Sequence, residues 1–157
     1  MLIGITGDTH GDQQAIKKLV KKAPTVAKWL HTGDFFLDAD VLAKESELPV
    51  ISVAGNNDVA TVNDLNRVFI VAGHKVWLTH GHKFIYRGIT NLLYKAEELG
   101  VEVVVYGHTH IPEIAWHGDI LSINPGSPSY PRGGSKRGFV LLELTEGEKP
   151  RAEYVAL

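Results

Sequence analysis

A chain of 157 residues is long enough for one domain with a sizeable core, and we expect residues 1–157 to form a single domain. Hydrophobic residues make up 44% and charged residues 22%, and the net charge of −2 gives no broad electrostatic footprint for nucleic acid or an anionic membrane. The apolar runs are too short to span a bilayer and no export signal opens the chain, so we expect a cytoplasmic protein.

Strands alternate with helices in the first part of the chain. Buried strands are expected at residues 2–6, 27–30 and 50–53, and helices at residues 13–22 and 38–44. Asp12 is placed to cap the first helix, and Pro24 ends it. The βαβαβ order predicts parallel strands joined by right-handed crossovers.

The pattern changes to a hairpin after the third strand. Strands at residues 68–71 and 75–79 are separated by only three residues, a spacing suited to a hairpin. A helix is expected at residues 89–99, ending at Gly100, and a β-branched strand at residues 101–106. We expect the remaining strands to be antiparallel, at residues 114–116, 120–123, 139–144 and 152–157.

Five of the expected strands end in polar turns. In chain order these are Gly7-Asp8-Thr9-His10, Gly33-Asp34, Gly55-Asn56-Asn57-Asp58, His80-Gly81-His82 and Gly107-His108-Thr109-His110. Because ligand sites in α/β sheets lie at the carboxyl ends of strands, we expect the turns to meet along one rim. If the backbone stays extended after the first strand, Asp8 and His10 point the same way and converge.

The turns supply three oxygen donors and four imidazoles as candidate metal ligands, and no cysteine is present to add a thiolate. Taken singly, each histidine is more often a hydrogen-bonded structural group, and the Asp8–His10 pair could merely cap a turn. Together they suffice for two ions about 3.5–4 Å apart that share a carboxylate. Mixed imidazole and oxygen ligands favour borderline divalent ions, with Mn as the first choice and Ni, Fe, Co or Zn as alternatives.

The five motifs, in this order, resemble those of the calcineurin-like metallophosphoesterase superfamily, and most closely its small single-domain phosphodiesterase branch, between Asp8 and Arg132. The resemblance implies an α/β fold in which two packed mixed β-sheets are flanked by helices, a four-layer αββα sandwich. It also implies a metal-dependent phosphodiesterase that hydrolyses small phosphate esters with a hydroxide bridging two metal ions.

The same resemblance assigns roles to individual residues. Asp8, His10 and His110 would bind the first ion, Asn56, His80 and His108 the second, and Asp34 would bridge them. The catalytic candidates are Asn57, Asp58 and His82. The segment from Asn124 to Ser127, followed by Pro131 and Arg132, resembles a late motif near the family's site, where it could shape a loop or present backbone N–H groups to a phosphate.

One position departs from the wider family, in which the turn after the third strand usually reads Gly-Asn-His and the histidine protonates the leaving group. Here that position is Asn57, whose neutral amide cannot donate a proton as an imidazolium can. His82 is the nearest candidate for this role by sequence, and the alternative is that it only supports the ligands.

A non-catalytic function is the alternative reading, because the chain also resembles the retromer coat subunit, a protein-binding scaffold of the same fold. The complete ligand set favours the enzyme, since a scaffold has no physical reason to keep it. We expect no membrane partner and no clear nucleic-acid surface, while a homo-oligomer is compatible with the sequence. The other histidines, His31, His74 and His117, are expected to be structural or at the surface, and Trp29, Trp77 and Trp116 to lie in the core or at an interface.

Overall fold

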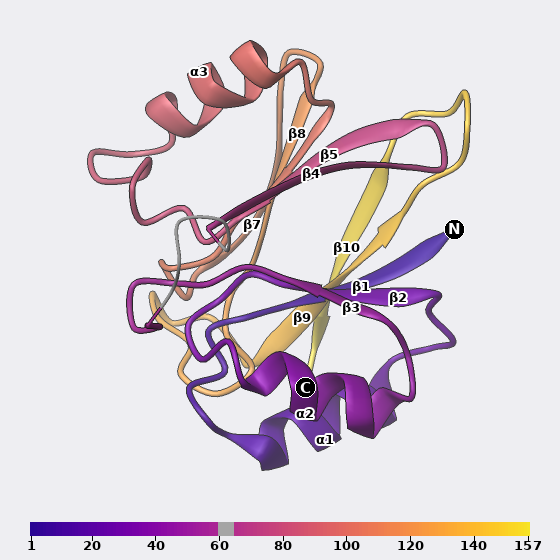
Figure 1. Ribbon diagram of the computed structural model, residues 1–157, viewed down its shortest axis with the longest axis vertical. Helices are drawn as coiled ribbons and strands as arrows, with labels where there is room; N and C mark the ends of the chain where they lie inside the picture. The colour runs from indigo at the N-terminus through magenta and orange to yellow at the C-terminus, as the bar shows by residue number, and fades with distance from the viewer. Residues whose placement is uncertain (60–64) are drawn as a thin grey trace.

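The structure is a computed structural model that describes residues 1–59 and 65–157 (Figure 1). Three helices are described: α1 (Gln13–Lys22), α2 (Asp38–Ser46) and α3 (Thr90–Leu99). The described strands are β1 (Leu2–Thr6), β2 (Lys28–His31), β3 (Val50–Ser52), β4 (Asn66–Val71), β5 (His74–Thr79), β6 (Val103–Val105), β7 (Pro112–His117), β8 (Ile120–Pro125), β9 (Gly138–Glu143) and β10 (Arg151–Ala156). None of these helices has the length and apolarity that a membrane crossing requires.

The strands form two mixed sheets of five. Sheet A has the order β10-β9-β1-β2-β3, and sheet B has the order β4-β5-β6-β8-β7. Figure 1 shows α1 and α2 on the outer side of sheet A and α3 on the outer side of sheet B. The expected four-layer αββα sandwich is therefore confirmed.

The core lies between the two sheets, and each sheet has a second apolar layer beneath its helices. Alternate residues of one strand serve the two layers: Leu30 of β2 packs into the central core, while its neighbour Trp29 packs outward under α1 and α2. On sheet B, Val103 and Val105 face the central core and Val104 faces α3. Central strands buried on both faces explain the continuous apolar runs of the sequence.

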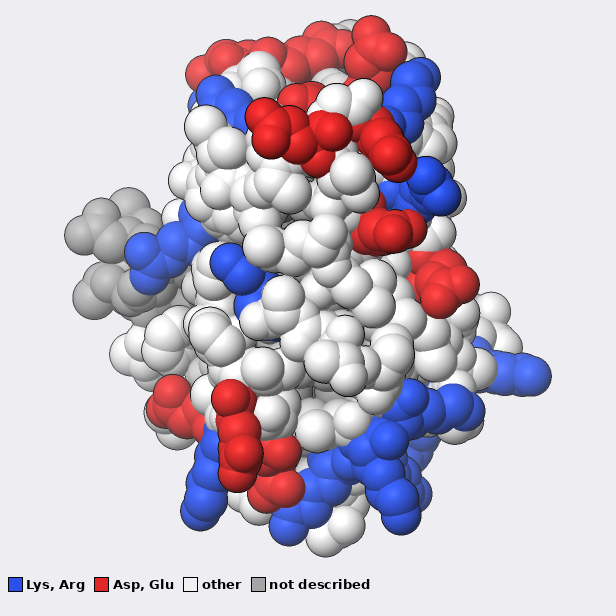
Figure 2. All heavy atoms as spheres, turned by 90° about the vertical axis from the view of Figure 1, so that its right-hand side faces the viewer, with Lys and Arg blue, Asp and Glu red and all other residues white. Residues whose placement is uncertain are grey.

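Helix α1 shows how the local pattern fixes an element. The Asp12 carboxylate accepts a hydrogen bond from the Ala15 N–H at 3.0 Å, which caps the helix as expected. Ile16 and Leu19 are fully buried on its inner face. Its exposed face carries Lys17, Lys18, Lys21 and Lys22, and Figure 2 shows basic side chains gathered at this helical end of the molecule.

The expectation for the second half was wrong in one respect, because β8 is not purely antiparallel. Strand β8 lies between β6 and β7 and pairs parallel with β6, through Val103 with Leu121 and Val105 with Ile123. The chain passes from β6 to the edge position of β7, and the tight turn after His117 then brings β8 back beside β6. That return direction makes the β6–β8 pair parallel, which a hairpin pattern alone does not reveal.

The three tryptophans divide between core and surface. Trp29 and Trp77 are each 1% exposed, as expected for core residues. Trp116 is 44% exposed on the edge strand β7, and the Lys149 ammonium lies 5.5 Å from its ring centroid. Two of the three rings therefore serve the core, and the third lies at the surface of sheet B.

Candidate active site

The carboxyl ends of β1, β2, β3, β5 and β6 bring all five polar turns to one rim. The parallel pairs β1–β2, β2–β3 and β5–β6 point these ends the same way within each sheet. In Figure 1 the loops that follow β1, β2 and β3 lie together on the left of the view. The predicted clustering follows from the parallel order of these strands.

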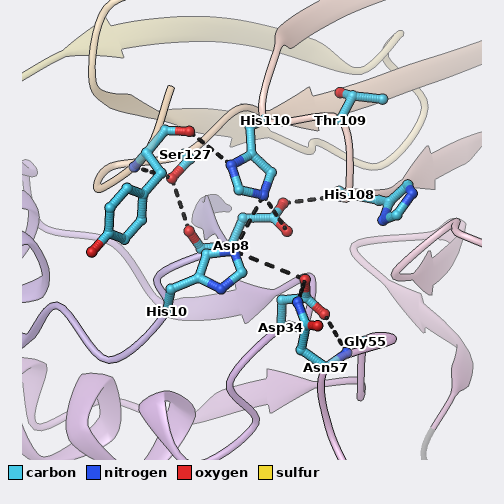
Figure 3. Close-up of polar contacts among 12 residues, drawn as sticks. Asp8, His10, Asp34, Gly55, Asn57, His108, Thr109, His110 and Ser127 are labelled. Carbon is cyan, nitrogen blue, oxygen red and sulfur yellow. Dashed lines mark hydrogen bonds and ion pairs between the residues drawn. The ribbon is translucent and has the colours of Figure 1, made fainter. Parts of the chain in front are cut away.

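Four side chains from this rim converge closely, and we call them the first donor group: Asp8, His10, Asp34 and His110. One ligand atom of each lies within 4.8 Å of the others. Their nitrogens and oxygens face one another in Figure 3, with His110 Nε2 3.5 Å from Asp8 Oδ1 and His10 Nε2 3.2 Å from His110 Nε2. Within residues 1–59 and 65–157, no other set of three or more histidine or carboxylate groups meets as tightly.

The backbone reaches this arrangement by a route that we did not expect. Asp8 and His10 have φ angles of 50° and 48°, so the turn is left-handed at both residues and the condition of an extended backbone is not met, although the two side chains still converge. Asp34, His108 and His110 also have positive φ, at 53°, 71° and 60°. Non-glycine residues in this region carry strain of about 1–3 kcal/mol each, and such strain is found chiefly at functional sites.

Two histidines are oriented by backbone carbonyls. His110 Nδ1 donates to the Tyr130 carbonyl at 2.7 Å, and His80 Nδ1 donates to the Thr32 carbonyl at 2.8 Å. In the neutral ring, the Nε2 atom is then left with a free lone pair directed at the rim. This arrangement fixes the tautomer that metal-ligating histidines use.

The remaining candidate ligands form the second donor group, Asn56, His80 and His108, which is less compact. His80 Nε2 lies 3.1 Å from Asn56 Oδ1 and 3.4 Å from Asp34 Oδ1. The ring of His108 is packed edge-on to that of His80, with the centroids 5.2 Å apart. Figure 3 shows the His108 ring to one side of the Asp8 carboxylate, which instead accepts the His108 backbone N–H at 2.9 Å.

The chemistry of these donors fits divalent cations. The lone pair of His80 Nε2 faces two oxygens that are themselves acceptors, a contact that a cation would turn from repulsive to attractive. Asp8 Oδ1 is buried and has no hydrogen-bond partner in the structure. Burial, followed by the charge of Asp34, raises the pKa of Asp8 well above its ordinary value, and a cation beside the carboxylate would oppose both effects.

Three imidazoles of the rim, those of His80, His108 and His110, are held in the neutral form that binds metal. Burial lowers the pKa of His80 to about 4. Burial is also the largest cause of the lowered pKa of His108 and of His110, to which the nearby Arg132 charge contributes. At neutral pH these rings therefore offer lone pairs and not additional protons.

Two glycines of the turns are required by close backbone approach. A Cβ atom at Gly55 would lie 2.1 Å from Asp34 Oδ1, and one at Gly107 would lie 2.4 Å from Thr32 Oγ1 and 2.7 Å from Asp8 Oδ2. Any side chain at either position would displace a candidate ligand. These glycines therefore serve the packing of the turns around the site.

Asn57 and Asp58 act on their neighbours in different ways. Asn57 donates from its backbone N–H to Asp34 Oδ1 at 3.1 Å and from its side-chain amide to Asp34 Oδ2 at 2.7 Å. The Asp58 carboxylate accepts the backbone N–H groups of Phe35, Phe36 and Gly55 at 2.7–3.0 Å. Asp58 thus ties the turn after β3 to the loop after β2, while Asn57 touches the central carboxylate.

His82 lies next to the second donor group. Its ring centroid is 5.4 Å from that of His80 and 6.2 Å from that of His108. Its Nδ1 atom is buried and has no hydrogen-bond partner in the structure. Burial, followed by the charge of His108, lowers the pKa of His82.

A cavity of about 560 Å³ opens onto both donor groups. Its lining comprises His10, Asp34, Asn56, Asn57, His108, His110, Tyr130, Pro131 and Arg132. Sequence reasoning missed Tyr130, whose only signal was an aromatic residue in a loop otherwise rich in Pro, Gly and Ser. Its ring meets the His10 ring edge-on at a centroid distance of 5.8 Å.

The late motif supports the rim from beneath. Ser127 Oγ donates to the Asp8 carbonyl at 2.8 Å and accepts the Ser129 and Tyr130 N–H groups. The Asn124 amide donates to the Gly107 carbonyl at 2.9 Å. Both side chains therefore shape the loops of the site, one of the two roles expected for them.

The three histidines outside the motifs are structural. His31 is fully buried, donates to Thr9 Oγ1 from Nε2 at 3.1 Å and accepts the Gly33 N–H at Nδ1. His74 bridges Glu102 and the Thr145 carbonyl, and His117 lies 3.1 Å from Ser122 Oγ. These contacts account for each ring without a ligand.

Comparison with known proteins places this site in a family. A family model described as a calcineurin-like phosphoesterase superfamily domain matches residues 1–147. A protein of Methanothermobacter thermautotrophicus named "Probable metallophosphoesterase" is 36% identical, over 99% of this chain and 92% of the relative. The phosphodiesterase YfcE of Escherichia coli is 30% identical, over 91% of this chain and 88% of the relative.

A solved structure supports the fold itself. Vps29 of Entamoeba histolytica complexed with Zn²⁺ superposes with a TM-score of 0.78 at 23% identity, covering 99% of this chain and 98% of that chain. The candidate metal ligands, the two-sheet fold and the matching family model all lead to the same family. The chain belongs to the calcineurin-like phosphoesterase superfamily.

Proposed function

We propose that this chain is a phosphodiesterase that uses two divalent ions held at the rim. Asp8, His10 and His110 would hold the first ion, Asn56, His80 and His108 would hold the second, and Asp34 would be shared by both. The observation that carries the proposal is the approach of four donor atoms, from Asp8, His10, Asp34 and His110, to within 4.8 Å of one another. The relatives named as phosphoesterases supply the class of reaction.

Bound divalent ions supply a water of lowered pKa and neutralise charge on the phosphoryl oxygens. The protein's contribution is to fix the donors, through the carbonyls of Thr32 and Tyr130 that orient His80 and His110. Arg132 lines the same cavity and presents a positive charge to an incoming phosphate ester. We expect Mn to support activity best, since mixed imidazole and oxygen ligands suit borderline ions.

Three neighbouring residues have separate roles. Asn57 holds the Asp34 carboxylate through two hydrogen bonds, so we assign it a positioning role. Asp58 positions the turn that carries Asn56 and Asn57 by binding three backbone N–H groups. His82 is the candidate proton donor, because it adjoins the second donor group and its Nδ1 is otherwise unpaired.

The scaffold alternative has weaker support in this chain. The Vps29 structures share the fold at 18–24% identity, and a shared fold at this identity does not imply a shared function. The oriented histidines and the unpaired Asp8 oxygen have no use in a purely structural surface. A scaffold role is compatible with catalysis because the rim occupies only one part of the molecule.

The test is hydrolysis of bis(4-nitrophenyl) phosphate by purified protein that has been stripped with a chelator and reloaded with Mn. We expect two ions per chain by elemental analysis and activity that appears only on reloading. The monoester 4-nitrophenyl phosphate, assayed in parallel, separates phosphodiesterase from general phosphatase activity. Metal-loaded protein that hydrolyses neither ester would contradict the proposal.

A further inference from the structure

A second, apolar groove adjoins the proposed active site on the side of the loop after β2. It encloses about 360 Å³. Its lining consists of Phe35, Phe36, Leu37, Asn57, Asp58 and Val59. Asn57 also lines the metal-site cavity, so the groove and the cavity share one wall.

The loop that forms the groove exposes three large apolar side chains in succession. Phe35, Phe36 and Leu37 are 43%, 37% and 72% exposed. Such a run on a surface is unfavourable because it leaves apolar area in contact with water, and it is expected only where the exposed side chains serve a function. The hydrophobic core beneath α2 already has Leu42 in place and does not account for them.

The structure holds this loop in an unfavourable conformation. Phe35 has a φ of 80°, which is an outlier for a bulky residue. Asp58 secures the strained turn by accepting the Phe35 and Phe36 N–H groups, and Asp38 accepts the Gly11 N–H at 2.8 Å. The apolar side chains are therefore held next to the site by specific hydrogen bonds.

Among the described residues of the groove, the polar side chains are those of Asn57 and Asp58, and both are hydrogen-bonded within the protein. The Asp58 carboxylate has three backbone partners, and the Asn57 amide is bonded to Asp34. What the groove offers a ligand is apolar surface, beginning at the Phe35 ring, whose centroid lies 6.1 Å from that of His10. A ligand that reaches from the metal site into the groove must be charged at one end and apolar at the other.

We propose that the groove lined by Phe36 and Leu37 binds an uncharged aryl or similarly apolar group of the phosphate ester and selects substrates that carry one. This inference rests on the proposed function, because the phosphoryl end must sit at the metal site. The two cavities lie next to each other and share Asn57 as a lining residue, and this adjacency is the reason to choose a substrate group as the occupant.

The test compares two ligands that share a phosphoryl-like end and cannot be hydrolysed. Calorimetric titration of Mn-loaded protein with phenylphosphonate and with methylphosphonate gives the ratio of their dissociation constants. We expect the phenyl compound to bind about tenfold more tightly in the wild-type protein, from burial of the ring. Phe36→Ala combined with Leu37→Ala should reduce that ratio to about threefold or less.

The matched control is Ile70→Ala, which removes an apolar side chain that is 73% exposed on β4. It should leave the ratio at the wild-type value. A wild-type ratio near one, or a ratio that the double variant does not change, would overturn the inference. A dimer that the double variant dissociates, with the ratio unchanged, would overturn it in favour of a second copy as the occupant.

Failure of this inference can be told apart from failure of the proposed function. Hydrolysis of bis(4-nitrophenyl) phosphate by wild-type protein reports on the proposed function alone. The phosphonate ratio requires no turnover and reports on the groove. Active protein with no phenyl preference would overturn the groove and leave the phosphodiesterase proposal standing.

Discussion

The two donor groups of the rim differ in how far the protein alone has assembled them. In the first donor group, Asp8, His10, Asp34 and His110 already converge. In the second, His80 approaches Asn56 and Asp34, while the His108 ring packs against His80 and its backbone N–H binds Asp8. A preformed site loses less conformational entropy when its ligands bind an ion, so we expect the first ion to bind more tightly than the second.

The difference has a physical origin in the two sheets. Three residues of the first donor group follow the neighbouring strands β1 and β2, whose register is fixed by direct parallel pairing. The first donor group takes only His110 from sheet B, whereas the second takes Asn56 from sheet A and both of its histidines, His80 and His108, from sheet B. Both groups depend on the packing between the sheets, which is set by side chains and not by hydrogen-bonded register, but the first has three donors already held in register.

The largest effect should come from the first donor group, through Asp8→Asn. We expect loss of the first ion and a fall in kcat/KM of about 10³-fold or more, because Asp8 supplies a charged ligand. Metal content and hydrolysis of bis(4-nitrophenyl) phosphate measure the two effects. Asp119→Asn, on an exposed turn, is the control for loss of one carboxylate.

The same substitution should stabilise the metal-free protein. The raised pKa of Asp8 means that above its ordinary pKa of 3.8 the unfolded state ionises more readily, so ionisation favours unfolding at neutral pH. An asparagine amide could donate to His110 Nε2, which Asp8 Oδ1 faces at 3.5 Å. We expect a gain of about 1–2 kcal/mol in urea unfolding with chelator present. A variant that is less stable and still active would contradict the account of the first donor group.

The second donor group should respond more mildly, through His108→Ala. We expect the metal content to fall from two ions to one and activity to fall by about 10²-fold, with the fold retained because a rim residue contributes little to the core. His117→Ala removes a histidine of β7 whose ring contacts Ser122 Oγ, away from the rim, and serves as the control. Two ions and full activity in His108→Ala would remove the distinction between the groups.

This comparison also marks what could be predicted from sequence. Strand and helix periodicity predicted most elements to within a few residues, and the five turns predicted the rim, because both patterns are local. The left-handed backbone at Asp8 and His10 could not be predicted, since a sequence of alternating donors is compatible with either conformation. The carbonyls of Thr32 and Tyr130 that orient the histidines leave no trace in residue type, because every residue has a carbonyl.

The other features that the sequence did not predict depend on contacts between residues that are distant along the chain. The parallel pairing of β8 with β6 follows from an inserted strand, and the hairpin signal before β8 is the same for either arrangement. The apolar side chains of Phe36 and Leu37 resemble core residues in sequence, and only the structure shows them exposed. The roles of Asn57 and Asp58 were likewise decided by which oxygen and which N–H groups they meet.

The pH dependence should separate the two groups again. Metal binding requires neutral imidazoles, and the pKa of His80 is lowered to about 4, with that of His108 lowered as well. As the pH falls, protons compete at both groups, at Asp8 in the first because its pKa is raised and at His80 and His108 in the second. The weaker hold on the second ion then decides the order, so the second ion leaves first. We expect the metal content to pass through one ion per chain before the protein becomes metal-free in acid.

The measurement is a pH profile of activity at limiting and at saturating Mn. A tenfold increase in Mn should move the acid limb lower by up to about one pH unit if one imidazole proton is displaced. An acid limb that does not move with Mn would mean that a group outside both donor groups governs it. The pH profile would then contradict the expectation that acid acts by removing a weakly held second ion.

The smallest effect concerns proton donation beside the second donor group. Because Asn57 donates to Asp34 and cannot act as an acid, activity should depend steeply on the pKa of the leaving group unless His82 supplies the proton. A series of aryl methyl phosphates measures this dependence at constant charge. With a 4-nitrophenolate leaving group, which departs readily, we expect Asn57→His to change the rate by less than about tenfold.

The slower members of the series then decide between the two residues. If no acid operates in the wild-type protein, Asn57→His should flatten a steep dependence and His82→Ala should leave it unchanged. If His82 is the donor, the wild-type dependence is shallow and His82→Ala steepens it, since the ring lies beside His80 with its Nδ1 unpaired. A shallow dependence that neither substitution alters would mean that a step other than leaving-group departure limits the rate. The assignment of His82 as proton donor and of Asn57 as the position of a missing acid would then both be contradicted.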